Sequence, residues 1–128
     1  MKNFGLKNTK YAALYSFLIL AFSFSTYFVK YNYPPAVFWD ENYHIASAQK
    51  YIDGTMFMEV HPPLGKMFIA LGEYIIQPNK NLDTHKFVET DYIKDFPQGY
   101  SFAGVRLFPT LFAWLSAIVF FFILYFLS

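Results

Sequence analysis

The sequence predicts an all-α membrane protein in which two transmembrane helices are joined by a polar loop. Two uncharged, apolar stretches lie near the two ends of the 128-residue chain. Charged residues make up only 15% of the chain, whereas soluble domains carry roughly a quarter. The apolar residues are concentrated in those two stretches, while a soluble core would need them to be spread more evenly.

Residues 11–29 form the first predicted span. These 19 positions hold no charged residue, and a helix that crosses the hydrocarbon core of a bilayer needs about 20. Residues 1–10 contain three lysines and no acidic residue, which places them in the cytoplasm by the positive-inside rule. The alternative is a cleaved signal peptide with a processing site near Ala21-Phe22-Ser23, which would still leave a second span.

Residues 107–127 form the second predicted span, with 21 uncharged residues rich in Phe, Leu and Ile. Arg106 marks its boundary, and Pro109 falls in its first turn, where a missing N–H group costs little. With two spans, residues 30–106 lie on the extracytoplasmic side. We therefore expect an integral protein of the cell membrane with one large outer loop.

The loop is expected to contain a capped helix and an interfacial amphipathic helix. The first runs from about Glu41 to Ile52, is capped by Asp40 and closed by Asp53-Gly54, and carries an apolar stripe. The second runs from about Leu64 to Ile76 and is too short and too charged to span, so it should lie in the membrane interface. The stripe residues are Ile45, Ala48 and Ile52 in the first helix, and Leu64, Phe68, Leu71 and Ile75 in the second. Residues 77–99 show no clear periodicity and are predicted to be an exposed connector.

Several kinds of function are excluded by composition. The formal net charge is +1, so no basic surface for nucleic acid is expected. Cysteine is absent, which excludes disulfides, thiolate metal sites and a cysteine nucleophile in these residues. A metal site made from Asp40, His44 and His61 is conceivable, but no ligand spacing supports it, so neither a metal nor a cofactor is expected.

Three positions in the loop could carry chemistry. Asp40-Glu41 could supply a base near an acceptor hydroxyl, although spacing alone favours a helix cap and a favourable helix dipole. His61-Pro62-Pro63-Leu64-Gly65-Lys66 leads into a helix N-terminus, which could bind a phosphate or be an ordinary turn. Arg106 could bind a lipid phosphate through its planar guanidinium or extend to the headgroups at the span's edge.

These residues resemble the protein O-mannosyltransferase family, whose members have the GT-C membrane fold. The resemblance rests on Phe38-Trp39-Asp40-Glu41, on Glu59-Val60-His61-Pro62-Pro63-Leu64-Gly65-Lys66, and on an arginine at the start of the second span, in that order. The family often has Asp in place of Glu59, and its histidine after the Asp-Glu pair falls one place before His44. Family members have about a dozen spans, so this chain is similar to their N-terminal part only.

The resemblance implies an inverting transfer of a sugar, expected to be mannose, from a polyprenyl-phosphate carrier to Ser/Thr hydroxyls of exported proteins. By the same resemblance, Asp40 is the expected general base, and Glu41 orients the acceptor or a nearby cation. The negative charge of the phosphate is expected to be stabilised by Arg106, Lys66 and His61. The expected partners are the lipid-linked sugar donor, membrane lipid, the protein acceptor and the remaining spans of the enzyme.

Two alternatives remain open from the sequence. The same chemistry could act on a lipid or cell-wall glycan acceptor, because acceptor contacts would lie in parts of the fold that two spans do not supply. The chain could also be a non-catalytic two-span membrane protein whose outer loop binds a partner. We expect that these 128 residues would not catalyse transfer alone.

Overall fold

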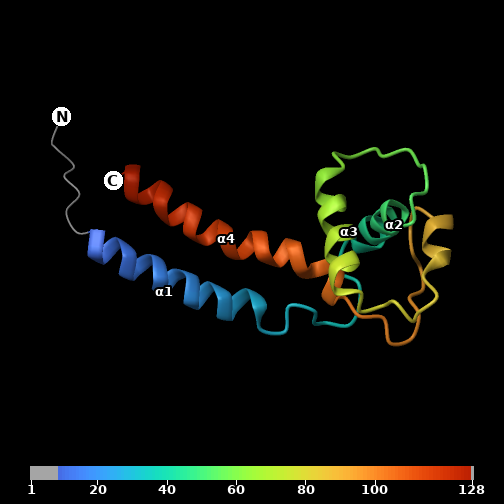
Figure 1. The fold of residues 1–128 in the computed structure, drawn as a ribbon, viewed down its shortest axis with the longest axis horizontal. Helices are drawn as coiled ribbons and strands as arrows, with labels where there is room; N and C mark the ends of the chain where they lie inside the picture. The colour runs from blue at the N-terminus through green and yellow to red at the C-terminus, as the bar shows by residue number, and fades with distance from the viewer. Residues whose placement is uncertain (1–8, 128) are drawn as a thin grey trace. The chain divides into compact units, whose positions relative to one another are not determined.

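The computed structural model describes residues 9–127, and all of the regular structure in that range is helical (Figure 1). Contacts divide the chain into two compact units. Among the described residues, one unit comprises residues 9–29 and 111–127, and the other comprises Lys30–Thr110. The helices, in chain order, are α1 (Thr9–Phe28), α2 (Glu41–Ile52), α3 (Leu64–Ile76), the short 3-10 helix η1 (His85–Glu89) and α4 (Ala103–Leu127).

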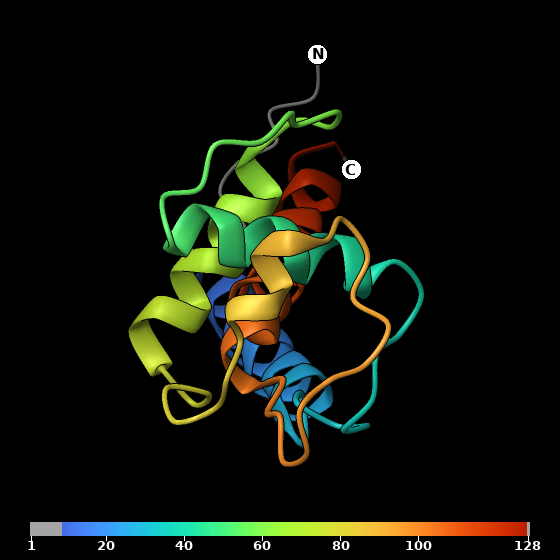
Figure 2. The same ribbon diagram turned by 90° about the vertical axis from the view of Figure 1, so that its right-hand side faces the viewer.

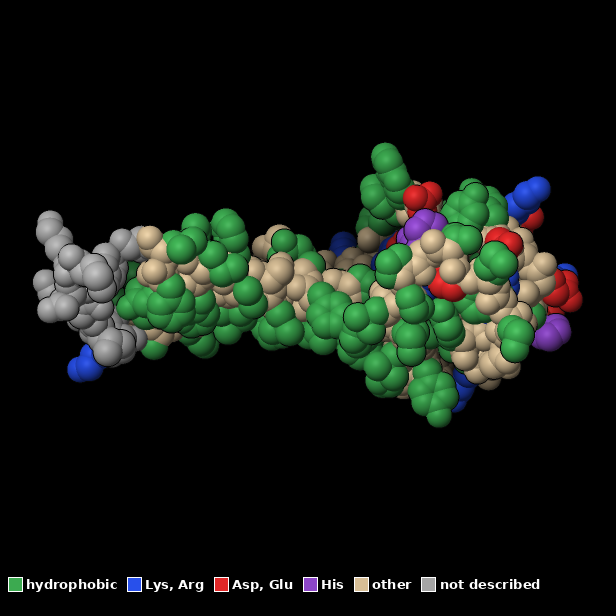
Figure 3. All heavy atoms as spheres, turned by 90° about the horizontal axis from the view of Figure 1, so that it is seen from above, with side chains coloured by type: hydrophobic (Ala, Val, Ile, Leu, Met, Phe, Trp, Pro, Cys, Tyr) green, Lys and Arg blue, Asp and Glu red, His purple; other side chains and the backbone are tan. Residues whose placement is uncertain are grey.

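The first unit consists of two helical segments whose surfaces are apolar. Hydroxyl groups of α1 donate to carbonyls one turn back, as from Ser16 to Ala12 at 2.8 Å and from Thr26 to Phe22 at 2.9 Å, so they add little polarity to the helix surface. The Trp114 indole donates to the Leu20 carbonyl at 2.9 Å. The visible face of this unit is almost entirely hydrophobic, whereas acidic, basic and His side chains gather over the other unit (Figure 3).

Both long helices are long and apolar enough to cross a membrane. The candidate spans are Lys10–Phe28 and Ala103–Leu127. The predicted boundary of the second span is wrong by four residues, because α4 begins at Ala103 and not at Leu107. Pro109 therefore lies inside α4, beyond its first turn, where it cannot donate to the carbonyl four residues earlier.

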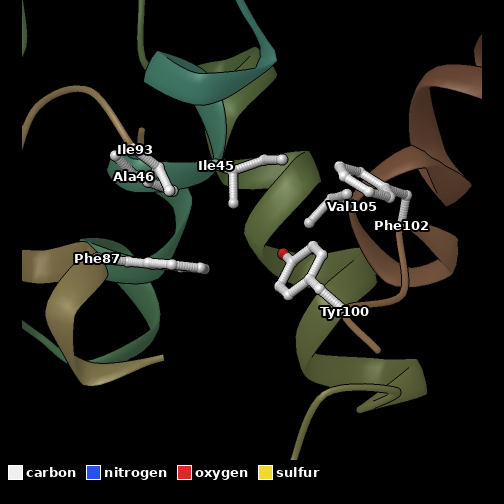
Figure 4. Close-up of a cluster of buried hydrophobic side chains, with 7 residues drawn as sticks. All are labelled: Ile45, Ala46, Phe87, Ile93, Tyr100, Phe102 and Val105. Atoms are coloured by element: carbon white, nitrogen blue, oxygen red, sulfur yellow. The ribbon is translucent and has the colours of Figure 1, made fainter. Parts of the chain in front are cut away.

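The second unit is built around a small apolar core. Ile45 and Ala48 of the predicted stripe are 3% and 1% exposed, and α2 has the predicted bounds. Helix α2 packs against α3 and against η1 (Figure 2). The core cluster draws on α2, η1, the connector and the first turn of α4 (Figure 4), and its members are Ile45, Ala46, Phe87, Ile93, Tyr100, Phe102 and Val105.

Residues 77–99 are not simply an exposed connector, which corrects the sequence-based expectation. Phe87 in η1 and Ile93 after it are 3% and 2% exposed, so the segment contributes directly to the core. Asn42 of α2 donates from its side chain to the Ile93 carbonyl. The two buried apolar residues are six positions apart, which matches neither a helix nor a strand repeat, so hydrophobic periodicity did not indicate this packing.

Helix α3 approaches the first turn of α4 at two glycines. A Cβ atom on Gly72 would overlap the Gly104 carbonyl, and one on Gly104 would overlap Glu73. The contact is secured by Asn79, whose amide exchanges hydrogen bonds with the Ser101 backbone at 2.7 and 2.8 Å and donates to Glu73 at 2.8 Å. The two glycines therefore allow a backbone approach that larger residues would prevent.

The opposite side of α3 is apolar and exposed. Of the four residues predicted to share its apolar face, Leu64, Leu71 and Ile75 are 63%, 40% and 59% exposed. Phe68 is half-buried, with its ring 5.4 Å from that of Phe108. The bounds of α3 agree with the prediction.

Candidate active site

The adjacent carboxylates Asp40 and Glu41 have different surroundings. Asp40 occupies the N-cap position of α2, but its side chain makes no capping hydrogen bond, so the predicted side-chain cap is wrong. Its carboxylate is exposed and has no hydrogen-bond partner among the described residues. Glu41 instead turns back and accepts a hydrogen bond from the Phe38 N–H at 2.8 Å, which satisfies a backbone donor just before the helix.

Glu41 is also bound by Arg106 from the first turn of α4. Arg106 Nε donates to Glu41 Oε1 and Nη2 donates to Glu41 Oε2, both at 2.7 Å. The two side chains are 12% and 25% exposed. Such a bidentate pair is stronger and more directional than a single charged contact. It joins two residues that are 65 positions apart in the sequence.

The remaining donors of Arg106 bind three backbone carbonyls before α2. Nη1 donates to Asn32 at 3.1 Å and to Pro34 at 2.8 Å, and Nη2 donates to Ala36 at 2.8 Å. A guanidinium has five N–H groups, and Arg106 makes five hydrogen bonds in all. In this arrangement Arg106 holds the segment that leads to Asp40, and a phosphate could bind it only by displacing one of these partners.

A cavity of about 600 Å³ brings the predicted site residues Asp40, His61 and Lys66 together. Glu41 and Arg106 do not line it. The walls come from the N-terminal half of α2, from the chain before α3 and from the start of α3. The other lining residues are Tyr43, His44, Ser47, Phe57, Met58, Glu59, Val60 and Asp91.

Glu59 organises the wall that carries the His-Pro-Pro motif. It accepts a hydrogen bond from Lys66 Nζ at 2.6 Å and from the His61 N–H at 3.1 Å. The Glu59 and Lys66 side chains are 14% and 8% exposed. Burial alone would raise the pKa of Glu59, but the hydrogen bonds from Lys66 and His61 and their charges lower it below its ordinary value. Lys66 is therefore already neutralised within the protein.

His44, Glu59 and Asp91 are not among the predicted site residues, although all three line the cavity. The Nδ1 atom of His44 is buried without a hydrogen-bond partner among the described residues. Burial, followed by the charge of Lys66, lowers the pKa of His44, against an opposing effect of Asp40. The available signal was the spacing of four residues between Asp40 and His44, which places both on one side of a helix.

Asp91 reaches the cavity through a contact that spacing could not indicate. Its carboxylate lies 2.5 Å from the ammonium group of Lys50, which is buried in α2, and the hydrogen bond and charge of Lys50 lower the pKa of Asp91. Within residues 9–127, no group of three or more His, Cys, Asp or Glu side chains is arranged to hold a metal ion.

Comparison with known proteins identifies the family of the chain. The family model described as dolichyl-phosphate-mannose-protein mannosyltransferase matches residues 17–128, which include all five predicted site residues. No solved structure matches the chain significantly.

Three curated relatives illustrate the similarity. Protein O-mannosyl-transferase 2 of Danio rerio is 38% identical over 79 residues, which cover 55% of this chain and 10% of that protein. Protein O-mannosyl-transferase 2 of Drosophila melanogaster is 43% identical over 53 residues, or 41% of this chain and 7% of that protein. Dolichyl-phosphate-mannose–protein mannosyltransferase 1 of Candida albicans is 41% identical over 73 residues, or 56% of this chain and 8% of that protein.

The matched segments span a tenth or less of the length of these relatives. The family match, in contrast, extends over most of the chain and includes both candidate spans in large part. The chain belongs to the dolichyl-phosphate-mannose-protein mannosyltransferase family.

Proposed function

We propose that this chain contributes the acceptor-activating part of an inverting glycosyltransferase. The enzyme would move mannose from a polyprenyl-phosphate carrier to Ser/Thr hydroxyls of exported proteins. The observation that carries the proposal is the cavity that Asp40, whose carboxylate makes no capping hydrogen bond, lines together with His61 and Lys66. The family name supplies the donor and the kind of acceptor.

In the proposed reaction, Asp40 accepts the proton of the acceptor hydroxyl. The hydroxyl oxygen attacks the anomeric carbon of mannose from the face opposite the carrier. The bond between that carbon and the phosphate oxygen breaks, and the phosphate leaves with the electron pair. One displacement inverts the anomeric configuration, so a single carboxylate base is sufficient and no covalent glycosyl-enzyme is needed.

The leaving phosphate is proposed to bind at the N-terminus of α3. The N–H groups of Leu64 and Gly65 have no hydrogen-bond partner among the described residues, and no atom lies within 4 Å of where a Cβ on Gly65 would be. Free N–H groups and the helix dipole favour an anion there. His61 lines the same cavity and can donate a hydrogen bond, whereas the charge of Lys66 is already balanced by Glu59.

Glu41 and Arg106 are proposed to act on Asp40 from outside the cavity. Glu41 is held by two hydrogen bonds from Arg106, and this bidentate contact supports a positioning role better than contact with the acceptor or a cation. Residues 30–106 are proposed to lie on the extracytoplasmic side, where the lysines of residues 1–10 would place them by the positive-inside rule.

The experiment is to incubate membranes containing the full-length protein with radiolabelled polyprenyl-phosphate-mannose and a Ser/Thr-containing acceptor peptide. The expected result is an alkali-labile label on the peptide, with the anomeric configuration opposite to that of the donor, that is absent from membranes without the protein. Label only in lipid or glycan would move the acceptor to that class. The absence of label in any product would favour a non-catalytic membrane protein.

A further inference from the structure

The chain between α2 and α3 contains an extended stretch, Thr55–Val60, in which no turn or bend occurs. Exposure alternates along it. Met56, Met58 and Val60 are 97%, 88% and 75% exposed. Alternation with a period of two is the geometry of a β-strand whose two faces have different surroundings.

The two intervening side chains, Phe57 and Glu59, are directed into the protein. The Phe57 ring lies 5.1 Å from that of Tyr51 and beneath the ammonium group of Lys50. Glu59 is held by Lys66, as described above. The inward residues therefore anchor the stretch, and the outward residues are held in place without packing against the chain.

The backbone of this stretch is also unpaired. The N–H and C=O groups of Met56 to Val60 form no hydrogen bond with any residue in the described part of the chain. Its ends are fixed, because the Thr55 N–H donates to the Lys50 carbonyl at 2.9 Å and the His61 N–H donates to Glu59. In the ribbon view the connection from α2 to α3 forms an edge of the unit (Figure 1). An anchored, extended segment with free backbone groups can pair with another extended chain.

The position of this stretch indicates which chain it pairs with. Phe57, Met58 and Val60 line the same cavity as Asp40. A polypeptide aligned along the stretch would therefore pass the carboxylate proposed as the base. Backbone pairing is indifferent to the sequence of the partner, and methionine side chains adapt to different apolar surfaces. A lipid chain could use the apolar side chains but could not use the backbone donors and acceptors.

We propose that Thr55–Val60 binds the acceptor polypeptide by strand addition and so presents its hydroxyl side chain to Asp40. This inference rests on the proposed function, because it names the way in which that enzyme would hold its acceptor. Met56, Met58 and Val60 provide the contact with acceptor side chains, and the backbone between them provides the alignment.

The test uses acceptor peptides that carry one N-methyl group, moved one residue at a time along the peptide. The full-length protein in membranes is assayed for mannosyl transfer from polyprenyl-phosphate-mannose. An N-methyl group removes a backbone donor without changing a side chain. We expect the KM for the peptide to rise about tenfold or more at alternate positions near the acceptor residue, with little change between them. The KM for the donor should not change.

A second measurement identifies the occupant directly. A photoreactive amino acid in place of Met56 should cross-link to the acceptor peptide, and the same amino acid in place of Tyr74 on the exposed face of α3 should not. Cross-links from position 56 to lipid alone would overturn the inference and indicate contact with the bilayer. A KM that rises without a period of two would also overturn it. If transfer proceeds normally with every methylated peptide, strand pairing is wrong and the proposed function stands. If no peptide is mannosylated by the unaltered protein, both proposals fail.

Discussion

The cluster around Arg106 and the cavity around Asp40 contain adjacent residues, Glu41 and Asp40, and are opposite in their hydrogen bonding. In the Arg106 cluster, five N–H donors meet the Glu41 carboxylate and three backbone carbonyls. In the cavity, the Asp40 carboxylate and the His44 Nδ1 atom have no partner among the described residues. Glu41 and Asp40 are adjacent in the sequence, yet Glu41 belongs to the cluster with fully used hydrogen-bond donors and Asp40 belongs to the cavity with unpartnered groups.

The sequence pattern presents Asp40 and Glu41 as one Asp-Glu motif, but this difference gives the two residues separate tasks, one in holding the structure and one in being available to a substrate. A saturated cluster is rigid, because each of its groups would lose a partner if it moved. An open polar group in a cavity is available to a substrate. The same comparison divides the five predicted site residues, since Asp40, His61 and Lys66 line the cavity while Glu41 and Arg106 hold one of its walls.

The largest effect is expected when the open carboxylate is neutralised. Asp40→Asn should lower the rate of mannosyl transfer by roughly 10²- to 10⁴-fold, because an amide cannot accept the hydroxyl proton. Folding should be unaffected, since Asp40 makes no side-chain hydrogen bond. Transfer to a peptide is measured with radiolabelled donor, and Asp53→Asn at the other end of α2 serves as the control. Near-normal transfer by Asp40→Asn would remove Asp40 from the role of base.

Breaking the saturated cluster should damage stability and activity together. Arg106→Lys keeps the charge but loses the bidentate pair and most carbonyl contacts, and we expect a loss of about 2 to 3 kcal/mol in the stability of this unit. Ala46 is 0% exposed, so a cysteine placed there reports unfolding through its rate of thiol labelling, read by mass spectrometry. Lys80→Met, at an exposed position, is the control. A variant that labels slowly yet fails to transfer would indicate that Arg106 contacts the substrate directly.

The ion pair of Glu59 and Lys66, which lines the cavity, is expected to contribute somewhat less to stability. Glu59→Gln leaves the buried Lys66 ammonium without its anion and should cost about 2 kcal/mol by the same labelling assay. Because the folded-state pKa of Glu59 is lowered, this stabilisation is present above the ordinary pKa of 4.5 and is lost as the pH falls through the folded value. Combining Glu59→Gln with Lys66→Met should cost less than the two single changes together. Strict additivity would mean that the pair is not coupled.

The smallest expected effect is that of replacing His44, and it appears in the stability of the protein only as the pH is lowered. Its folded-state pKa lies below the ordinary value of 6.5, so the unfolded chain binds the proton first and stability falls as the pH drops below about 6.5. Lys66 and His61 add to this shift, while Asp40 and Glu59 oppose it. His44→Gln should flatten the pH dependence of stability between pH 7 and 5, and His85→Gln on η1 should not. Equal slopes for His44→Gln and the unaltered protein would contradict the assignment.

Local signals predicted the helices well. Asp40 and Asp53-Gly54 bracket α2, and Pro62-Pro63 precede α3, so both helices have the predicted bounds. These signals act within one or two turns of chain and depend little on tertiary contacts. The start of α4 was misjudged because the charge of Arg106 suggested a boundary, whereas that charge is neutralised by Glu41 inside the first turn.

Contacts between distant residues could not be predicted in the same way. Arg106 meets Glu41, and Lys50 meets Asp91 41 positions away, yet nothing in the spacing of these residues indicates the pairing. The division of roles between Asp40 and Glu41 depends on those contacts. The sequence therefore predicted five candidate site residues, and the structure shows that Asp40, His61 and Lys66 line one cavity while Glu41 and Arg106 form a separate cluster.

The first turn of α4 contacts both walls of the cavity. Arg106 fastens the wall that carries Asp40, and Gly104, two residues earlier, abuts Gly72 of α3, the helix whose first turn carries Lys66. A rotation or axial shift of this turn as a unit would move the two walls in the same direction, so the distance between Asp40 and the first turn of α3 would change little. Bending α4 between Gly104 and Arg106 would instead alter that distance. Gly104 and Arg106 of one helical turn thus each contact one wall of the cavity, in addition to the direct packing of α2 against α3.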